Sequence, residues 1–250
     1  QPAASVVAAQ RYDSENDIFH PVYAANGMVA SEQELATQIG VEILKQGGNA
    51  VDAAVGVGFA LAVVLPNAGN IGGGGFMVLH DAKSGKDFTI DFREMAPLKA
   101  SKDMYLDSDG NVVDGKSLYT HFAVGVPGTV AGMEYALKKW GSLPLKKVLA
   151  PSIKLAEKGF PVSRTLADTL KTEKDTLGKW ESSKKIFFKN GEPLAAGDLL
   201  VQKDLADSLK KIAEQGSKAF YEGDIAHKIV AEMKKHDGLI SLEDMKNYRA

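Results

Sequence analysis

The chain has 250 residues, of which 44% are hydrophobic, and this length is near the upper limit for one domain with a sizeable core. Its net charge is −2 and it has no basic stripe, so we expect neither a nucleic-acid partner nor binding to an anionic membrane. It contains no cysteine, which excludes disulfides, thiolate metal sites and a cysteine nucleophile. No apolar run reaches the length of about 18 residues that a membrane span needs, so membrane insertion is not expected either.

The first 26 residues have no hydrophobic periodicity and are expected to form an irregular arm. The chain begins with Gln1 rather than Met, as it would after removal of a secretory signal. Residues 28–31 follow as a candidate for a short strand.

Two helices are expected before residue 66. The first begins at Ser31-Glu-Gln-Glu34, which has the spacing of a capping box, and ends at Gly47-Gly48. The second is capped by Asn49 and carries Asp52 in its first turn, where the helix dipole favours an anion. Because residues 50–65 are apolar on every face, we expect this second helix to be buried on all sides.

Four consecutive glycines, residues 72–75, follow the second helix. Ordering them costs backbone entropy, so the run is expected where a positive φ or a close backbone approach is required. The alternative is a phosphate-binding loop, but such a loop leaves a strand and opens a helix. These glycines leave a helix and open a strand. We therefore expect no nucleotide and no other cofactor.

Residues 76–79 and 88–92 are predicted to be the two strands of a hairpin. The first strand is apolar on both faces, which is typical of a sheet covered on both sides. The second alternates, so that the side chain of Arg93 is expected on the polar face at the end of the strand. A buried helix that leads into such a sheet indicates a layered α+β fold.

Arg93 is the candidate binding residue. Only four of the 30 Lys and Arg residues are arginines, so lysine supplies nearly all of the positive charge. A guanidinium group binds a carboxylate through two parallel hydrogen bonds, which a lysine cannot reproduce. The alternative is a structural ion pair with Asp91 or Glu94, and the residues alone do not decide between the two.

The second half of the chain is predicted to be mainly helical. Helices are expected in residues 129–140, 144–159, 163–177, 204–215 and 224–236, and another begins at Ser241. A short strand is predicted in residues 186–188, before a turn at Asn190-Gly191.

No catalytic residue and no metal site is expected within these 250 residues. The chain has no Gly-x-Ser-x-Gly elbow for a serine nucleophile. Residues 107–111 are a polar turn that lacks the glycine position and the distal glutamate of an EF-hand. The five histidines have no ligand spacing, and His121, close to Gly125, is the only one that stands out.

Four segments together resemble the large-subunit side of bacterial γ-glutamyltranspeptidase (glutathione hydrolase). They are Asn49-Ala-Val-Asp-Ala-Ala-Val55, Gly69-Asn-Ile-Gly-Gly-Gly-Gly-Phe76, Asp91-Phe-Arg-Glu-Met-Ala-Pro97 and Gly125-Val-Pro-Gly-Thr-Val-Ala-Gly132. The resemblance implies a four-layer αββα sandwich of the N-terminal-nucleophile hydrolase type, only partly contained in this chain. It also implies that Arg93 holds the α-carboxylate of a γ-glutamyl substrate, which favours the ligand interpretation over the ion pair.

The resemblance further implies a reaction and its partners. In that family a precursor cleaves itself, and the nucleophile is the threonine at the new N-terminus of the small subunit, whose α-amino group serves as the base. The expected substrates are γ-glutamyl compounds such as glutathione, and the acceptors are water, amino acids or peptides. The family also implies a periplasmic or secreted bacterial protein.

Residues 1–250 would then be the first part of a single large-subunit domain. In it, residues 27–130 supply the core helices and strands, and residues 131–250 are mainly helical. Because the nucleophile would lie on the small subunit, we expect this chain to be inactive alone.

Two other functions fit the same residues. A related N-terminal-nucleophile amidase would act on a glutaryl-cephalosporin or on poly-γ-glutamate. A non-catalytic module would bind an amino acid or another anion at Arg93 and the glycine turn, without turnover.

Overall fold

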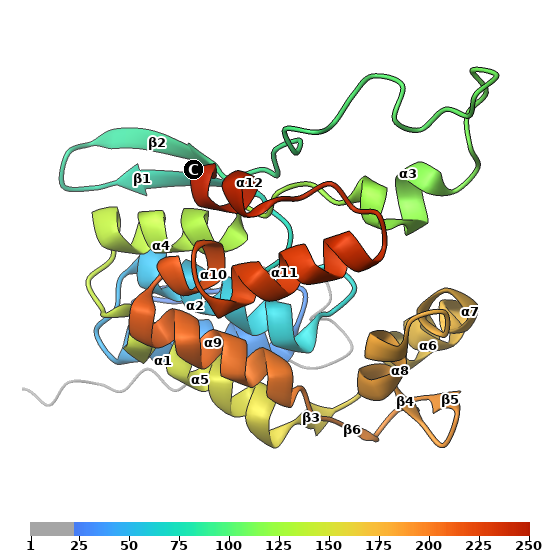
Figure 1. The fold of residues 1–250 in the computed structure, drawn as a ribbon. Helices are drawn as coiled ribbons and strands as arrows, with labels where there is room; N and C mark the ends of the chain where they lie inside the picture. Colours follow the sequence, from blue (N-terminus) through green and yellow to red (C-terminus); the bar gives the residue numbers. More distant parts are fainter. Residues whose placement is uncertain (1–22) are drawn as a thin grey trace, which may run out of the picture.

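The computed structural model describes residues 23–250, so the arm expected over residues 1–26 lies mostly outside the described part (Figure 1). The helices are α1 (Glu34–Lys45), α2 (Ala50–Val64), α3 (Lys116–Tyr119), η2 (His121–Ala123), α4 (Thr129–Trp140), α5 (Leu145–Lys158), α6 (Arg164–Thr172), α7 (Lys174–Leu177), α8 (Glu181–Phe187), α9 (Lys203–Gln215), α10 (Lys218–Tyr221), α11 (Asp224–Lys235) and α12 (Leu242–Asn247). The strands are β1 (Phe76–Asp81), β2 (Lys86–Asp91), β3 (Phe160–Pro161), β4 (Phe188–Lys189), β5 (Glu192–Pro193) and β6 (Leu199–Leu200). They form three two-stranded antiparallel sheets, β1–β2, β3–β6 and β4–β5.

Helix α2 lies at the centre of the core. It packs against α1, α4 and α5, and α9 covers the other side of α5. Most of its residues are buried, as its uniformly apolar sequence predicts. Asn49 caps its N-terminus and forms a capping box with Asp52, which confirms the predicted start.

The buried carboxylate of Asp52 also joins α2 to the connection between α4 and α5. It accepts hydrogen bonds from the backbone amides of Ser142 and Leu143 and from the Ser142 hydroxyl. Burial alone would raise the pKa of Asp52, but the hydrogen bonds from Ser142, Asn49 and Leu143 outweigh it and lower the pKa. The sequence indicates only the capping role, because these other partners lie far along the chain.

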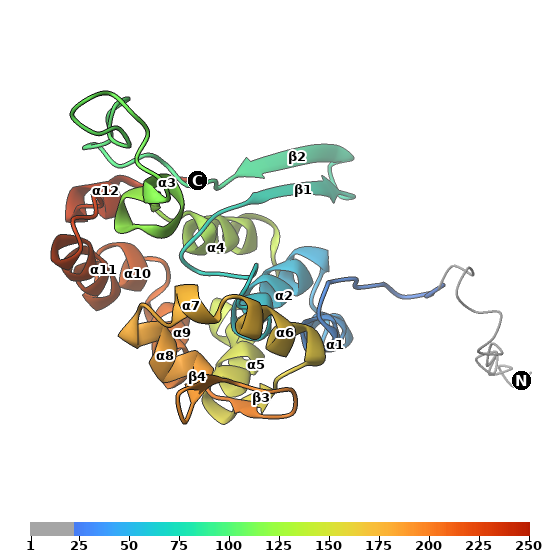
Figure 2. The same cartoon turned by 90° about the vertical axis from the view of Figure 1, so that its right-hand side faces the viewer.

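The β1–β2 hairpin lies over α4, with the helical core beneath it (Figures 1 and 2). The inward face of β2 carries Ile90, and Phe92 just beyond the strand continues it, so the predicted alternation is confirmed. The prediction that β1 is covered on both faces is wrong within residues 23–250. Phe76 and Val78 are 63% and 77% exposed. The described residues thus cover one face of the hairpin, and the four layers of a sandwich are incomplete within them.

Three local predictions differ from the structure. Residues 28–31 form no strand, and Gln33 rather than Ser31 caps α1, because its side-chain oxygen accepts from the amides of Leu35 and Ala36. The predicted helix over residues 163–177 is interrupted at Glu173, between α6 and α7. The strand predicted at residues 186–188 begins only at Phe188.

The other predicted helices are present, and Asn190 and Gly191 form the expected turn with φ values of 54° and 83°. The last helix, α12, begins with a capping box between Ser241 and Asp244. Among residues 23–250, no helix is both long enough and apolar enough to cross a bilayer.

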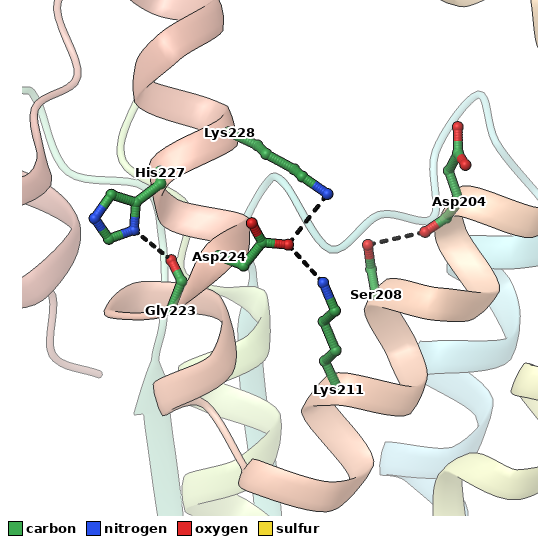
Figure 3. Close-up of polar contacts among 7 residues, drawn as sticks. All are labelled: Asp204, Ser208, Lys211, Gly223, Asp224, His227 and Lys228. Atoms are coloured by element: carbon green, nitrogen blue, oxygen red, sulfur yellow. Dashed lines mark hydrogen bonds and ion pairs between the residues drawn. The ribbon is translucent and has the colours of Figure 1, made fainter.

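Charged side chains link the C-terminal helices at the surface (Figure 3). The carboxylate of Asp224, at the start of α11, pairs with Lys211 on α9 and with Lys228 one turn further along α11. The hydrogen bonds from these two lysines lower the pKa of Asp224.

Candidate functional site

Arg93 lies two residues beyond the end of β2 and is exposed, as predicted. Its backbone amide donates a 2.9 Å hydrogen bond to the Asp91 carboxylate, and its carbonyl accepts one of 2.8 Å from the Tyr248 hydroxyl. Within residues 23–250, the guanidinium group forms no hydrogen bond and no ion pair. The structural alternative, an ion pair with Asp91 or Glu94, is therefore not formed in the described part of the chain.

The glycine run lies against the backbone on one side of Arg93. A Cβ atom on Gly74 would lie 2.6 Å from the Phe92 carbonyl oxygen and 2.9 Å from the Arg93 Cα. Gly75 and Phe92 exchange two backbone hydrogen bonds, of 3.3 and 3.0 Å, which extend the β1–β2 ladder. None of the four glycines has a positive φ. Close backbone approach, the second of the two reasons that the sequence suggests, therefore accounts for Gly74.

The segment from Gly125 to Gly132 supports Arg93 from another side. Val126 and Met95 form an antiparallel bridge with hydrogen bonds of 2.8 and 3.2 Å. A Cβ atom on Gly128 would collide with the Phe92 carbonyl oxygen and the Tyr248 hydroxyl, so this position requires glycine. Three of the four segments singled out in the sequence thus meet at the backbone around Arg93.

Asn70 ties the glycine run to the start of α4. Its side-chain oxygen accepts hydrogen bonds from the Gly73 amide at 2.7 Å and the Thr129 hydroxyl at 2.9 Å. The Gly73 carbonyl in turn accepts from the amides of Gly128 and Thr129. The turn is therefore fixed by hydrogen bonds to protein groups.

Tyr248 completes the support of Arg93, and sequence reasoning missed it. It is buried and stacks on Tyr221, with 5.7 Å between the ring centroids and 8° between the ring planes. Burial, together with the negative charges of Asp91 and Glu94, raises the pKa of Tyr248 to about 12. The hydroxyl is therefore protonated at neutral pH and can donate to the Arg93 carbonyl.

Replacement of Tyr248 by phenylalanine is expected to lower the free energy of unfolding by about 1 kcal/mol. The substitution keeps the ring stacking but removes the only described hydrogen bond to the Arg93 carbonyl. Tyr119→Phe is the matched control, because Tyr119 is 59% exposed. Urea unfolding of the three proteins measures the difference, and equal midpoints would show that the Tyr248 hydroxyl does not stabilise the site.

The other residues singled out in the sequence lie away from Arg93. The Asp107 carboxylate accepts hydrogen bonds from the amides of Asp109 and Asn111, as in an ordinary polar turn. His121 lies beside His236, with Glu232 close to both. Histidine spacing along the chain gave no sign of this cluster, because His121 and His236 come from distant segments.

Residues 36–250 match the family described as Gamma-glutamyltranspeptidase. This chain belongs to the γ-glutamyltranspeptidase family. The resemblance carried by the four sequence segments is thereby confirmed.

Relatives in this γ-glutamyltranspeptidase family extend beyond the chain. The "Glutathione hydrolase proenzyme" of Escherichia coli (strain K12) is 57% identical over 96% of this chain and 41% of its own length. The crystal structure of Helicobacter pylori γ-glutamyltranspeptidase has a TM-score of 0.90 and 50% identity, over 92% of this chain and 66% of that one. A cephalosporin acylase from Bacillus halodurans has a TM-score of 0.82 and 32% identity, over 100% of this chain and 45% of that one.

These similarities confirm the predicted α+β class and its N-terminal-nucleophile hydrolase type. The chain spans about two fifths of the length of the curated relatives it matches. It is therefore similar to one part of these γ-glutamyltranspeptidases.

Proposed function

We propose that this chain is the large-subunit part of an enzyme that cleaves the γ-glutamyl amide of glutathione and related compounds. The observation that supports it is the exposed guanidinium of Arg93, which has no counter-ion within residues 23–250. Three chain segments fix the backbone beneath it. An arginine positioned in this way can bind the α-carboxylate of the substrate through two parallel hydrogen bonds.

In this proposal Arg93 positions the substrate for a nucleophile on the small subunit. The hydroxyl oxygen of an N-terminal threonine attacks the γ-carbonyl carbon, and the threonine α-amino group accepts the hydroxyl proton. That proton then passes to the departing amine as the amide bond breaks, leaving a γ-glutamyl ester. Water or the amino group of an amino acid or peptide attacks the ester and restores the threonine.

The exposed apolar face of the β1–β2 hairpin favours the presence of a partner chain that covers it. Phe76 and Val78 project from β1 on the side away from the helical core, where solvent contact with large apolar side chains is unfavourable. We propose that the small subunit from the same precursor covers this face and supplies the second sheet of the αββα sandwich. Residues 1–250 then form part of one large-subunit domain, in a protein that is periplasmic or secreted.

Hydrolysis rates of two matched anilides, γ-glutamyl and glutaryl, test which acyl group the protein prefers. They differ only in the α-amino group, so the comparison isolates its contribution. We expect the complete, processed protein to have a higher kcat/KM for the γ-glutamyl anilide, by roughly 10- to 100-fold, because a hydrogen bond to a charged group contributes about 1.5–3 kcal/mol. The isolated 250-residue chain is expected to hydrolyse neither anilide.

Two outcomes would contradict the proposal. A glutaryl rate equal to or above the γ-glutamyl rate would favour the second candidate, an amidase like the cephalosporin acylase whose structure this chain resembles. Saturable binding of glutamate by the complete protein, with no turnover of either anilide, would favour a binding module.

A further inference from the structure

Two histidines and a glutamate from distant parts of the chain form a cluster away from Arg93. His121 belongs to η2, Glu232 lies in the last turn of α11, and His236 directly follows that helix. The Nε2 atoms of His121 and His236 lie 3.7 and 3.2 Å from the same oxygen, Glu232 Oε1. One potential ligand atom from each residue lies within 4.8 Å of the other two.

These separations suit a small divalent cation. In a tetrahedral zinc site with bonds of about 2.1 Å, neighbouring ligand atoms are about 3.4 Å apart. The two measured nitrogen-to-oxygen distances lie on either side of that value. For both imidazoles to bind one ion, the stacked rings must turn so that their Nε2 lone pairs point to the same position.

The burial of the cluster leaves one side open to solvent. The side chain of His121 is 16% exposed and that of His236 is 29% exposed, whereas Glu232 is 49% exposed. An ion can thus enter past the carboxylate, and water can occupy the fourth coordination position. Two imidazoles and one carboxylate form a ligand set that binds zinc in proteins.

The ring nitrogens of His121 and His236 lack hydrogen-bond partners among the described residues. The two rings are stacked at 4.5 Å, with 19° between their planes, and Trp180 lies with its edge or face against both. Within the described part of the chain, neither ring forms a hydrogen bond, and each lies only at ion-pair distance from Glu232. One carboxylate oxygen thus serves two imidazoles, and a cation at this point would bind all three groups at once.

We propose that His121, Glu232 and His236 form a binding site for Zn²⁺. The site joins η2 to the end of α11. It thereby closes the long excursion of residues 97–120, which begins shortly after Arg93 and returns to the Gly125 segment. Because neither ring nitrogen is oriented by a second protein group, the expected affinity is micromolar rather than that of a preformed structural site.

Calorimetric titration of the complete, metal-free protein with ZnCl₂ tests the site. We expect one Zn²⁺ per chain, and a loss of affinity of at least about tenfold in His121→Gln, Glu232→Gln and His236→Gln. His227→Gln is the matched control, because His227 lies on the same helix as Glu232 and its ring hydrogen-bonds to the Gly223 carbonyl (Figure 3). Its affinity for zinc is expected to be unchanged.

Trp180 gives a second readout that does not depend on activity. Its ring centroid lies 5.1 Å from that of His121 and 5.3 Å from that of His236, so a bound Cu²⁺ should quench its emission. The quenched component is expected to disappear in Trp180→Phe and to require much higher Cu²⁺ in His236→Gln.

Three binding results would overturn the proposal. They are the absence of zinc binding at millimolar concentration, stoichiometric binding that survives both histidine substitutions, and an equal loss of binding in His227→Gln. Circular dichroism and the zinc-dependent rise in Tm distinguish a lost ligand from a lost fold. Each histidine variant is compared with the native protein in the presence and in the absence of zinc. If the decrease in Tm is the same in both conditions, the cluster is an ion-paired contact and not a metal site.

Discussion

Arg93→Lys is expected to raise KM for a γ-glutamyl anilide by roughly 10- to 100-fold and to change kcat much less. Lysine retains the charge but not the planar fork, so one of two hydrogen bonds to the α-carboxylate is lost, at about 1.5–3 kcal/mol. The contact is remote from the scissile bond and is equally strong in the ground state and the transition state. Its loss therefore appears in KM.

A substrate without the α-carboxylate makes this test specific. For a 4-aminobutanoyl anilide, the native protein is expected to lose at least the factor that Arg93→Lys loses on the γ-glutamyl anilide, because both hydrogen bonds to the α-carboxylate are absent. The substitution should then have little further effect, because the two changes remove the same contact. Arg164→Lys is the matched control, since Arg164 is another exposed arginine, at the start of α6. Equal losses on both substrates would assign Arg93 a structural role.

Asp52→Ala is expected to lower the free energy of unfolding by about 3 kcal/mol or more. The substitution leaves the amides of Ser142 and Leu143 without their acceptor and removes the capping box of α2, the central helix of the core. Asp204→Ala is the control, because Asp204 also lies in a first helical turn but its side chain is 84% exposed. Urea unfolding at pH 7 compares the variants, and a loss under 1 kcal/mol would contradict the prediction.

The same carboxylate predicts how stability depends on pH. Its pKa is lower in the folded protein than in the unfolded chain, so folding favours the ionised form. This stabilisation is complete above about pH 4, the range of an unfolded aspartate, and is lost as the pH falls through the folded pKa. The unfolding midpoint of Asp52→Ala should therefore fall less steeply than that of the native protein below pH 4.

The sequence predicts the elements whose signals are local. The apolar run after Asn49, the alternation before Arg93 and the Ser241 start signal all depend on neighbours within a few residues, and the structure has all three. The same alternation correctly predicts that Arg93 is exposed on the polar face at the end of the strand. The capping box at Ser31 is a local signal that fails, because the Ser31 hydroxyl bonds to Thr37 and to the Gln33 carbonyl instead.

Contacts between segments that are distant in the sequence could not be predicted. Tyr248 carries no sign in the sequence that it reaches Arg93, and the second role of Asp52 depends on a loop that only the packing of α2 against α4 and α5 brings near. The exposed face of β1 is a different case. Its apolar sequence predicts burial on both faces, but the described residues leave Phe76 and Val78 exposed.

The hydrogen bond between Tyr248 and Arg93 also bears on how the protein is synthesised. The two residues are separated by 155 positions, so the hairpin leaves the ribosome well before Tyr248 is synthesised. At about 5–20 residues per second, translation of that interval takes roughly 8–30 s. During this time Gly74 is already available to pack against Arg93, but Tyr248 has not yet been synthesised. Arg93 therefore reaches its final position only after the core around α2 has had time to form.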